Sequence, residues 1–175
     1  MRHEEYELNT ADGTKLFAQS WAPAGKVRGA VALVHGFGSY SGRYVVVAER
    51  FVDAGFAFTG FDLPGHGRTG GKRGDTSFGA IFEAIASHLE ETRRRAPGAP
   101  LFLYGQSLGG ALALKYAIER KPDISGVIAS SPLVGLLAPV APWKRALARL
   151  MCGISPSLVM DKILAFMLAG MNTHV

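Results

Sequence analysis

The sequence predicts an α/β fold with a mostly parallel central sheet and helices on both faces. Three observations lead to this prediction. Short apolar runs at residues 30–34, 101–104 and 126–129 have the length of buried strands. Segments with helical spacing of apolar residues alternate with these runs. The corner between residues 104 and 108 is rich in glycine, as in a tight turn from a strand into a helix.

The first half of the chain gives the elements in order. Residues 6–8 and 16–21 alternate loosely around Asp12-Gly13, which is typical of a hairpin. The run AVALV at residues 30–34 indicates a strand buried on both faces, and it is closed by His35-Gly36. Apolar residues at helical spacing indicate a helix over residues 41–54, and Gly55 is its stop signal.

The aromatic-rich segment 56–62 is predicted to be the next strand, and it leads into a glycine-rich loop at residues 64–74. One apolar face spans residues 78–89, in a helix that must end before Pro97. A strand at residues 101–104, a helix at 108–120 and a strand at 126–129 follow.

After Pro132 the composition changes. Residues 133–143 are apolar and punctuated by proline, and residues 144–151 look amphipathic, with cations at Lys144, Arg145 and Arg149. Residues 1–132 are therefore interpreted as the N-terminal part of the α/β core, and residues 133–175 as a partial lid or an aberrant tail. The cationic, apolar pattern also suits transient contact with a membrane surface, although a lid that faces substrate is the preferred hypothesis.

Composition narrows the possible partners and the compartment. Net charge is +5, but the clusters Lys72-Arg73 and 93–95 are not interleaved with aromatic residues, so nucleic-acid binding is not expected. The single Cys152 cannot form an internal disulfide, and the charged N-terminus does not have the pattern of a signal peptide. No apolar run reaches the ~18 residues that a membrane span needs. A cytoplasmic protein is expected.

The stretch Gly105-Gln106-Ser107-Leu108-Gly109 carries the functional hypothesis. A serine on a sharp turn between a strand and a helix has its hydroxyl pushed outward. Glycines two residues to either side avoid collisions with neighbouring backbone, and the helix N-terminus favours an anionic transition state. Ser107 is therefore the candidate nucleophile, and Gly110 extends the pattern. The alternative is a glycine-rich turn that serves packing alone.

A second loop, His35-Gly36-Phe37-Gly38, follows the first buried strand. Acyl transfer needs N–H donors aimed at a developing oxyanion, and the N–H groups of Phe37 and Leu108 are the predicted pair. His35 immediately ends a buried strand, so it is interpreted as a structural histidine that shapes this loop. His66 is likewise expected to brace its own loop.

These segments resemble the α/β-hydrolase fold, and within it the monoglyceride-lipase-like branch of serine aminopeptidase-like hydrolases and lysophospholipases. The resemblance covers residues 4–132 and rests on HGFGSYSGRY, FDLPGHGRTGGKRGD, PLFLYGQSLGG and VIASSPLV. It implies a Ser107 nucleophile, an oxyanion hole at Phe37 and Leu108, and hydrolysis of monoacylglycerols or similar acyl esters without cofactor or metal. Gln106 departs from the pattern, since histidine is more usual before the serine.

The same resemblance places the triad acid and histidine after the serine in the chain. The later candidates are Asp123, which precedes a strand, and Asp161 and His174, which lie in a tail that does not resemble the family. We therefore expect a chain that is incomplete at its C-terminus. The alternative function is a truncated hydrolase without catalytic competence, while thioester cleavage stays open and dehalogenation is disfavoured. The strand at residues 126–129 is expected to form an exposed sheet edge that promotes self-association.

Overall fold

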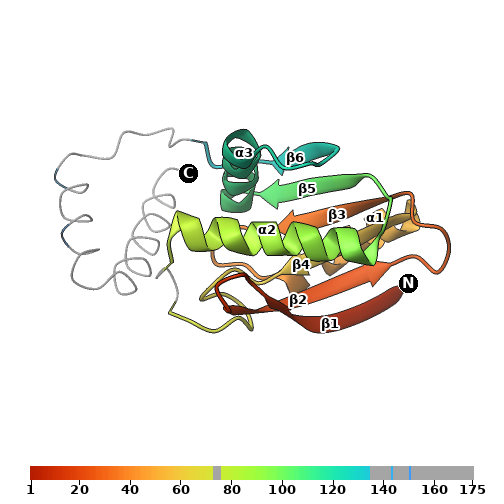
Figure 1. Ribbon diagram of the computed structural model, residues 1–175, viewed down its shortest axis with the longest axis horizontal. Coiled ribbons are helices and arrows are strands. Elements are labelled where there is room, and N and C mark those ends of the chain that lie inside the picture. The colour runs from red at the N-terminus through yellow and green to blue at the C-terminus, as the bar shows by residue number, and fades with distance from the viewer. Residues whose placement is uncertain (73–75, 135–142, 144–149, 151–175) are drawn as a thin grey trace, which may run out of the picture.

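The chain folds around one mixed six-stranded sheet with the strand order β1-β2-β4-β3-β5-β6 (Figure 1). The computed structural model describes residues 1–72, 76–134, 143 and 150. In chain order the elements are β1 (Arg2–Asn9), β2 (Lys15–Ala22), β3 (Gly29–Val34), η1 (Ser41–Tyr44), α1 (Val45–Asp53), β4 (Phe56–Phe61), α2 (Phe78–Arg95), β5 (Leu101–Gln106), α3 (Leu108–Arg120) and β6 (Gly126–Ser130).

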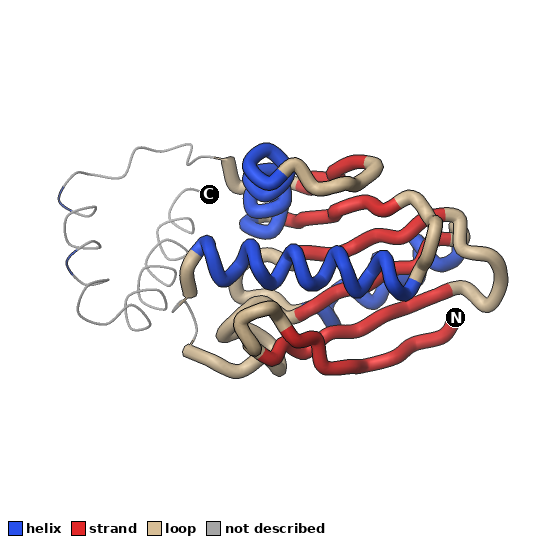
Figure 2. The backbone as a smooth tube through the Cα atoms, viewed as in Figure 1, coloured by secondary structure: helices blue, strands red, loops and turns tan. Residues whose placement is uncertain are grey.

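Four strands of the sheet are parallel to one another and two are antiparallel additions. Strands β4, β3, β5 and β6 run in the same direction, whereas β1 and β2 form the predicted antiparallel hairpin and β2 pairs antiparallel with β4. Figure 2 shows the strands side by side, with helices packed against them. The predicted mostly parallel sheet is therefore confirmed. Because loops at the carboxyl ends of parallel strands share one edge, this topology brings the ends of β3 and β5 together.

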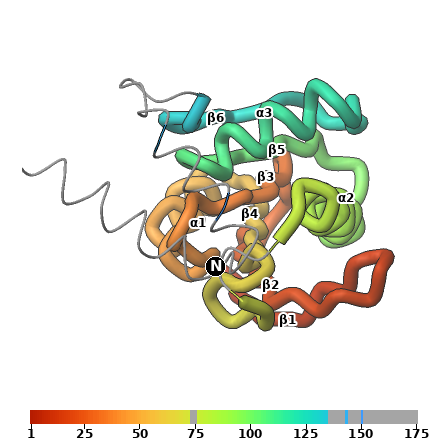
Figure 3. Tube along the Cα trace, turned by 90° about the vertical axis from the view of Figure 1, so that its left-hand side faces the viewer, coloured from red at the N-terminus to blue at the C-terminus, as the bar shows by residue number. Residues whose placement is uncertain are grey.

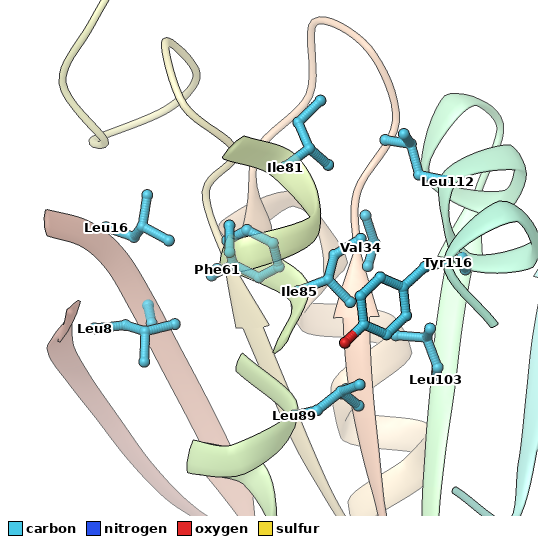
Figure 4. Close-up of a cluster of buried hydrophobic side chains, with 14 of the residues drawn as sticks. Leu8, Leu16, Val34, Phe61, Ile81, Ile85, Leu89, Leu103, Leu112 and Tyr116 are labelled. Atoms are coloured by element: carbon cyan, nitrogen blue, oxygen red, sulfur yellow. The ribbon is translucent and has the colours of Figure 1, made fainter. Parts of the chain in front are cut away.

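Helices cover both faces of the sheet, as predicted. Figure 3 shows α1 on one side of the sheet and α2 on the other. The α1 side holds a cluster that includes Trp21, Leu33, Tyr44 and Phe58. On the other face, α2 and α3 pack on alternate strand residues, and Figure 4 shows this larger cluster, which includes Val34, Phe61, Ile81, Ile85, Leu89, Leu103, Leu112 and Tyr116. Burial on both faces explains why β3 is a continuous apolar run.

Local signals set the helix ends close to the predicted positions. The hydroxyl of Ser77 accepts a hydrogen bond from Ala80 N at 3.1 Å and caps α2, which ends at Arg95 before Pro97. The helix predicted over residues 41–54 is divided, because η1 forms a 3₁₀ turn before α1 begins. The α3 bounds match the predicted residues 108–120.

Strand β6 lies at the edge of the described sheet, as predicted. It pairs with β5 on one side, and none of its residues is fully buried. The predicted division into a core and a segment 133–175 stays a prediction, because most of that segment, with Lys144, Arg145, Arg149 and Cys152, lies outside the described residues. In the described part of the chain, no helix combines the length and the apolar character needed to cross a bilayer.

Candidate active site

Ser107 lies at the corner between β5 and α3, where the sequence predicts a turn that exposes a nucleophile. Its backbone has φ of 54° and ψ of −119°, and among the described residues it is one of three other than glycine with positive φ. Such a conformation is strained for a residue with a side chain. The corner is held by Ser107 N–H, which donates to Ser130 O at 3.0 Å, and by Leu133 N–H, which donates to Ser107 O at 3.0 Å.

The flanking glycines fit because a side chain would collide with backbone. A Cβ on Gly105 would lie 2.2 Å from Gly109 O, and a Cβ on Gly109 would lie 2.0 Å from Val34 O. Gly110 is less tightly enclosed, with Gly105 O at 3.1 Å. Close packing alone would explain these glycines. It does not explain why a serine, rather than a glycine, holds the strained position 107.

The loop after β3 packs directly against this corner. A Cβ on Gly36 would lie 2.8 Å from Gln106 Oε1 and 3.4 Å from the Cβ of Ser107. The backbone at Gly36 and the side chain of Ser107 are therefore neighbours, as the shared carboxyl edge of β3 and β5 requires. The predicted oxyanion-hole residue Phe37 is the next residue of this loop.

His35 fixes the orientation of that loop. Its Nδ1 donates to Gly36 O at 2.8 Å, and its Nε2 accepts from Leu63 N–H at 2.9 Å. Burial lowers the pKa of His35 to about 4, so the ring is neutral around pH 7. Both ring nitrogens are occupied, which fits the predicted structural role and leaves no nitrogen free to act as a base.

The anchored carbonyl of Gly36 determines where the next N–H points. In a trans peptide the carbonyl of one residue and the N–H of the next point in opposite directions. Because Gly36 O accepts from His35 and from Ser39 N–H at 3.2 Å, the Phe37 N–H is directed away from both donors. It has no acceptor among the described residues. Leu108, the first residue of α3, likewise has no intrahelical acceptor for its N–H.

His66 packs beside this loop. Its Nδ1 donates to Pro64 O at 3.0 Å, as expected of a residue that braces its own turn. Its ring meets Phe37 edge-on with centroids 5.7 Å apart, and the His35 ring lies 5.4 Å away. Its Nε2 is buried and has no hydrogen-bond partner in the described structure. His66 therefore joins the glycine-rich loop to the loop that carries Phe37.

Asp62 is a residue that the sequence analysis missed. It directly follows β4 and is 1% exposed. Its Oδ1 accepts from Ser41 N–H at 2.6 Å and from the Ser41 hydroxyl at 2.7 Å, and its Oδ2 accepts from Arg68 N–H at 2.8 Å. A Cβ on Gly67 would lie 2.0 Å from Oδ2. An acidic residue directly after a buried strand and before Pro-Gly-His-Gly was the available sequence signal.

Asp123, the triad-acid candidate that lies within the described residues, is remote from the Ser107 corner. Asp123 precedes β6, at the opposite end of that strand from Ser130, which pairs with Gln106. Its carboxylate is fully exposed, 3.9 Å from Arg93. Asp161 and His174 lie outside the described residues. No group of three or more His, Cys, Asp or Glu side chains in the described part of the chain is arranged to hold a metal ion.

Two surface cavities lie apart from the Ser107 corner. One of about 360 Å³ is lined by residues of β1 and β2 together with Arg68. Its charges are already paired, Arg68 with Glu5 at 2.7 Å and Lys15 with Glu7 at 3.0 Å. A second, of about 200 Å³, is lined by residues of β1, β2 and β4 together with Val27 and Arg95. Neither includes Ser107, Phe37 or Leu108.

Similarity to known proteins extends over nearly the whole chain. A family model described as serine aminopeptidase S33 matches residues 25–173. Human monoglyceride lipase is 32% identical over 171 residues, which is 96% of this chain and 56% of the human protein. The chain thus spans about half the length of the curated relatives it matches.

Solved structures agree with this similarity. The monoacylglycerol lipase of Paleococcus ferrophilus is 40% identical, with a TM-score of 0.68 over 81% of this chain and 52% of that one. A soluble variant of Saccharomyces cerevisiae monoglyceride lipase, solved with a substrate analogue, is 32% identical, with a TM-score of 0.74 over 89% of this chain and 53% of that one.

Proposed function

The chain belongs to the serine aminopeptidase S33 family, and on this premise we propose that it hydrolyses carboxylic esters of acyl lipids through an acyl-enzyme on Ser107. Monoacylglycerols are the favoured substrate class, because two of the similar proteins are a monoglyceride lipase and a monoacylglycerol lipase. The observation that carries the proposal is the strained Ser107 at the start of α3, beside Gly36.

The reaction would proceed in two steps. Ser107 Oγ attacks the acyl carbonyl, loses its proton to a base, and forms a tetrahedral oxyanion; the ester C–O bond then breaks, and the alcohol leaves with a proton. Water attacks the resulting acyl-serine, releases the fatty acid and returns the proton to Ser107. A lone serine hydroxyl is a weak nucleophile at neutral pH, so the base is essential to the rate.

The oxyanion would be bound by the N–H groups of Phe37 and Leu108. Support comes from two independent features of the backbone. The His35 hydrogen bond turns the Phe37 N–H away from the Gly36 carbonyl, and the Leu108 N–H is one of the free donors at the start of α3. The positive end of the α3 dipole adds to this stabilisation.

An exposed apolar surface beside the corner suits an acyl chain. Leu133 is joined to Ser107 by its backbone hydrogen bond, and the residue is 48% exposed. Val134, the next residue, is 78% exposed. Apolar side chains exposed beside a nucleophile are expected where an acyl chain must leave water.

The base and its supporting acid are not assigned. In the described part of the chain, His35 has both ring nitrogens bonded, and His88 lies in the core on α2. Asp161 and His174 therefore stay candidates from the sequence alone. The alternative hypothesis, a fragment that lacks the triad acid and histidine, differs from the main proposal in the rate it predicts and not in the role of Ser107.

Three further expectations from the sequence stay predictions: a cytoplasmic location, the absence of a nucleic-acid partner, and transient contact of residues 133–175 with a membrane surface. The last is supported by apolar residues interspersed with Lys144, Arg145 and Arg149. Self-association through β6 is supported by the position of that strand at the edge of the described sheet.

The proposal is tested by trapping the acyl-enzyme. The chain and its Ser107→Ala variant are incubated with p-nitrophenyl butyrate, quenched in acid, digested and analysed by mass spectrometry. A butyryl group on the peptide that contains Ser107, absent from the variant, is the expected result. Acylation at another residue, or equal ester hydrolysis by both proteins, would contradict the assignment of Ser107.

A further inference from the structure

A chain of two hydrogen bonds joins the loop after β3 to the end of β5. The backbone N–H of Gly36 donates to the hydroxyl of Tyr44 at 3.3 Å. The same hydroxyl donates to Oε1 of Gln106 at 3.1 Å. Gly36 directly precedes Phe37, and Gln106 directly precedes Ser107. The two proposed parts of the site are therefore joined through one tyrosine.

The burial of Tyr44 restricts the geometry of this link. Tyr44 is 8% exposed and packs in the cluster on the α1 side of the sheet. The hydroxyl accepts from Gly36 N–H and donates to Gln106 Oε1, so it is engaged both as a donor and as an acceptor. Gly36 approaches Gln106 so closely that a Cβ on Gly36 would lie 2.8 Å from Oε1. The loop can rest on the glutamine amide only because residue 36 has no side chain.

The link completes the anchoring of residue 36. His35 holds the carbonyl of Gly36, and Tyr44 holds its N–H. With both groups fixed, the loop cannot rotate about Gly36 without breaking a buried hydrogen bond. The His35 ring ties the loop to Leu63, which follows β4, and the Tyr44 hydroxyl ties it to Gln106, the residue before the nucleophile.

We propose that Tyr44 and Gln106 are positioning residues that set the placement of the Phe37 N–H relative to Ser107. This proposal rests on the proposed function, because it assigns to the link a role in holding the oxyanion hole. In this proposal neither the Tyr44 nor the Gln106 side chain contacts substrate. The glutamine suits this task because its amide oxygen does not titrate and accepts a hydrogen bond at every pH at which the protein folds.

The link itself is tested by amide hydrogen exchange measured by NMR on the full chain. Tyr44→Phe removes the hydroxyl, and Gln106→Met removes the amide oxygen at nearly the same length. We expect Gly36 N–H to exchange about tenfold faster in Tyr44→Phe, while the amide of Leu103 in β5 keeps its protection. Tyr116→Phe is the matched control, a buried tyrosine on α3, and should leave Gly36 unchanged.

The decisive measurement is whether substitutions of Tyr44 and Gln106 affect the exchange of Gly36 N–H through one shared link. In Gln106→Met the amide signals of Phe37 and Leu108 should shift, and Gln106→Glu, which keeps an acceptor oxygen, should restore most of the original exchange at Gly36. The double variant should exchange no more than about twofold faster than Tyr44→Phe, because both changes break one link. Exchange at Gly36 that is insensitive to Tyr44→Phe, or effects that simply add, would overturn the link.

The role in positioning is tested by ester hydrolysis. Tyr44→Phe and Gln106→Met should each lower the Ser107-dependent kcat for p-nitrophenyl butyrate about tenfold and leave KM within about twofold, since the change acts on the transition state. Unchanged kcat in variants whose Gly36 exchange has risen would overturn the positioning role. Ester hydrolysis that is undiminished in Ser107→Ala would refute the proposed function instead, and the exchange data would still decide whether the link exists.

Discussion

The backbone N–H of Leu63 donates to Nε2 of His35 at 2.9 Å and so joins the loops that follow β4 and β3. Because Nε2 is the acceptor, the ring proton resides on Nδ1, where it donates to Gly36 O. A protonated imidazole carries hydrogen on both nitrogens and could not accept from Leu63. The conformation of the loop that carries Phe37 therefore depends on a neutral His35.

Acid should destabilise the fold well above the pH at which carboxylates titrate. Burial lowers the pKa of His35 to about 4 and that of His88 to about 3. Since the unfolded chain takes up these protons near pH 6.5 and the folded chain does not, stability is present above that pH and is lost as pH falls. Between pH 7 and pH 5 we expect a loss of about 2 kcal/mol for each histidine, measured by urea unfolding.

A variant separates the two contributions. His88→Gln removes one titrating group and should reduce the fall in unfolding free energy between pH 7 and pH 5 by about half. Carboxylates change the unfolding free energy at lower pH than the histidines do. Hydrogen bonds from Arg94 and Arg95 lower the pKa of Glu91, so the contribution of Glu91 to stability is lost only below pH 5. An unfolding free energy that is flat from pH 7 to pH 5 would show that both histidines titrate normally.

The glycines of the Ser107 corner should not tolerate a methyl group. In Gly109→Ala the new Cβ would lie 2.0 Å from Val34 O, and in Gly105→Ala it would lie 2.2 Å from Gly109 O, so backbone must move in either case. We expect each change to cost about 3 kcal/mol or more in chemical denaturation. Gly79→Ala is the control, because its Cβ has room in α2, with Ser77 Oγ at 3.6 Å, and should stabilise by up to about 1 kcal/mol.

Asp62 should be essential to the arrangement of the two loops it joins. Asp62→Ala leaves the N–H groups of Ser41 and Arg68 and the hydroxyl of Ser41 without their acceptor. A buried donor without a partner costs about 1–3 kcal/mol, so a total loss of about 3 kcal/mol or more is expected in urea unfolding. Asp123→Ala, at a fully exposed carboxylate, should change stability by less than about 0.5 kcal/mol.

The sequence was sufficient for the parts of the fold that depend on periodicity and on local stop signals. The run at residues 30–34 and the helix at residues 108–120 were predicted nearly to the residue, because burial on two faces and glycine at the helix start leave few alternatives. The 3₁₀ turn at Ser41–Tyr44 was missed, since its geometry depends on Asp62, a contact that spans 21 residues.

The candidate site, like the fold, was predicted where local spacing determines it and missed where distant residues meet. Ser107 and the flanking glycines were predicted from their spacing, and the corner geometry agrees. The link from Gly36 through Tyr44 to Gln106 was not predicted, because Tyr44 and Gln106 lie 62 positions apart and local spacing gives no sign of their contact. The pairing of β3 with β5 brings the ends of these two strands together. The convergence of the Phe37 and Leu108 N–H groups on one point stays a prediction.

The exposed edge at β6 should promote self-association. Ile128 is 38% exposed in a strand that pairs on one side only within the described sheet, and open strand edges recruit other chains. Light scattering coupled to size exclusion should show oligomers at high concentration, and Ile128→Lys should shift the population toward monomer. Val46→Lys, an exposed aliphatic position on α1, is the control and should have no effect. A monodisperse monomer before any substitution would contradict this prediction.

Activity of the 175-residue chain should be weak and should depend on Ser107. In the described structure His66 alone among the buried histidines keeps a ring nitrogen free near the loop that carries Phe37, and this Nε2 is enclosed. Without a base, an oxyanion hole and binding leave a residual rate of about 10³–10⁴-fold over water. With p-nitrophenyl butyrate, Ser107→Ala should remove turnover through an acyl-enzyme and leave at most this residual hydrolysis. His174→Ala and His66→Gln should leave the rate of the unmodified chain within about threefold. If the chain hydrolyses the ester at ordinary esterase rates and His174→Ala removes them, His174 is the base, and residues beyond the described part complete the site.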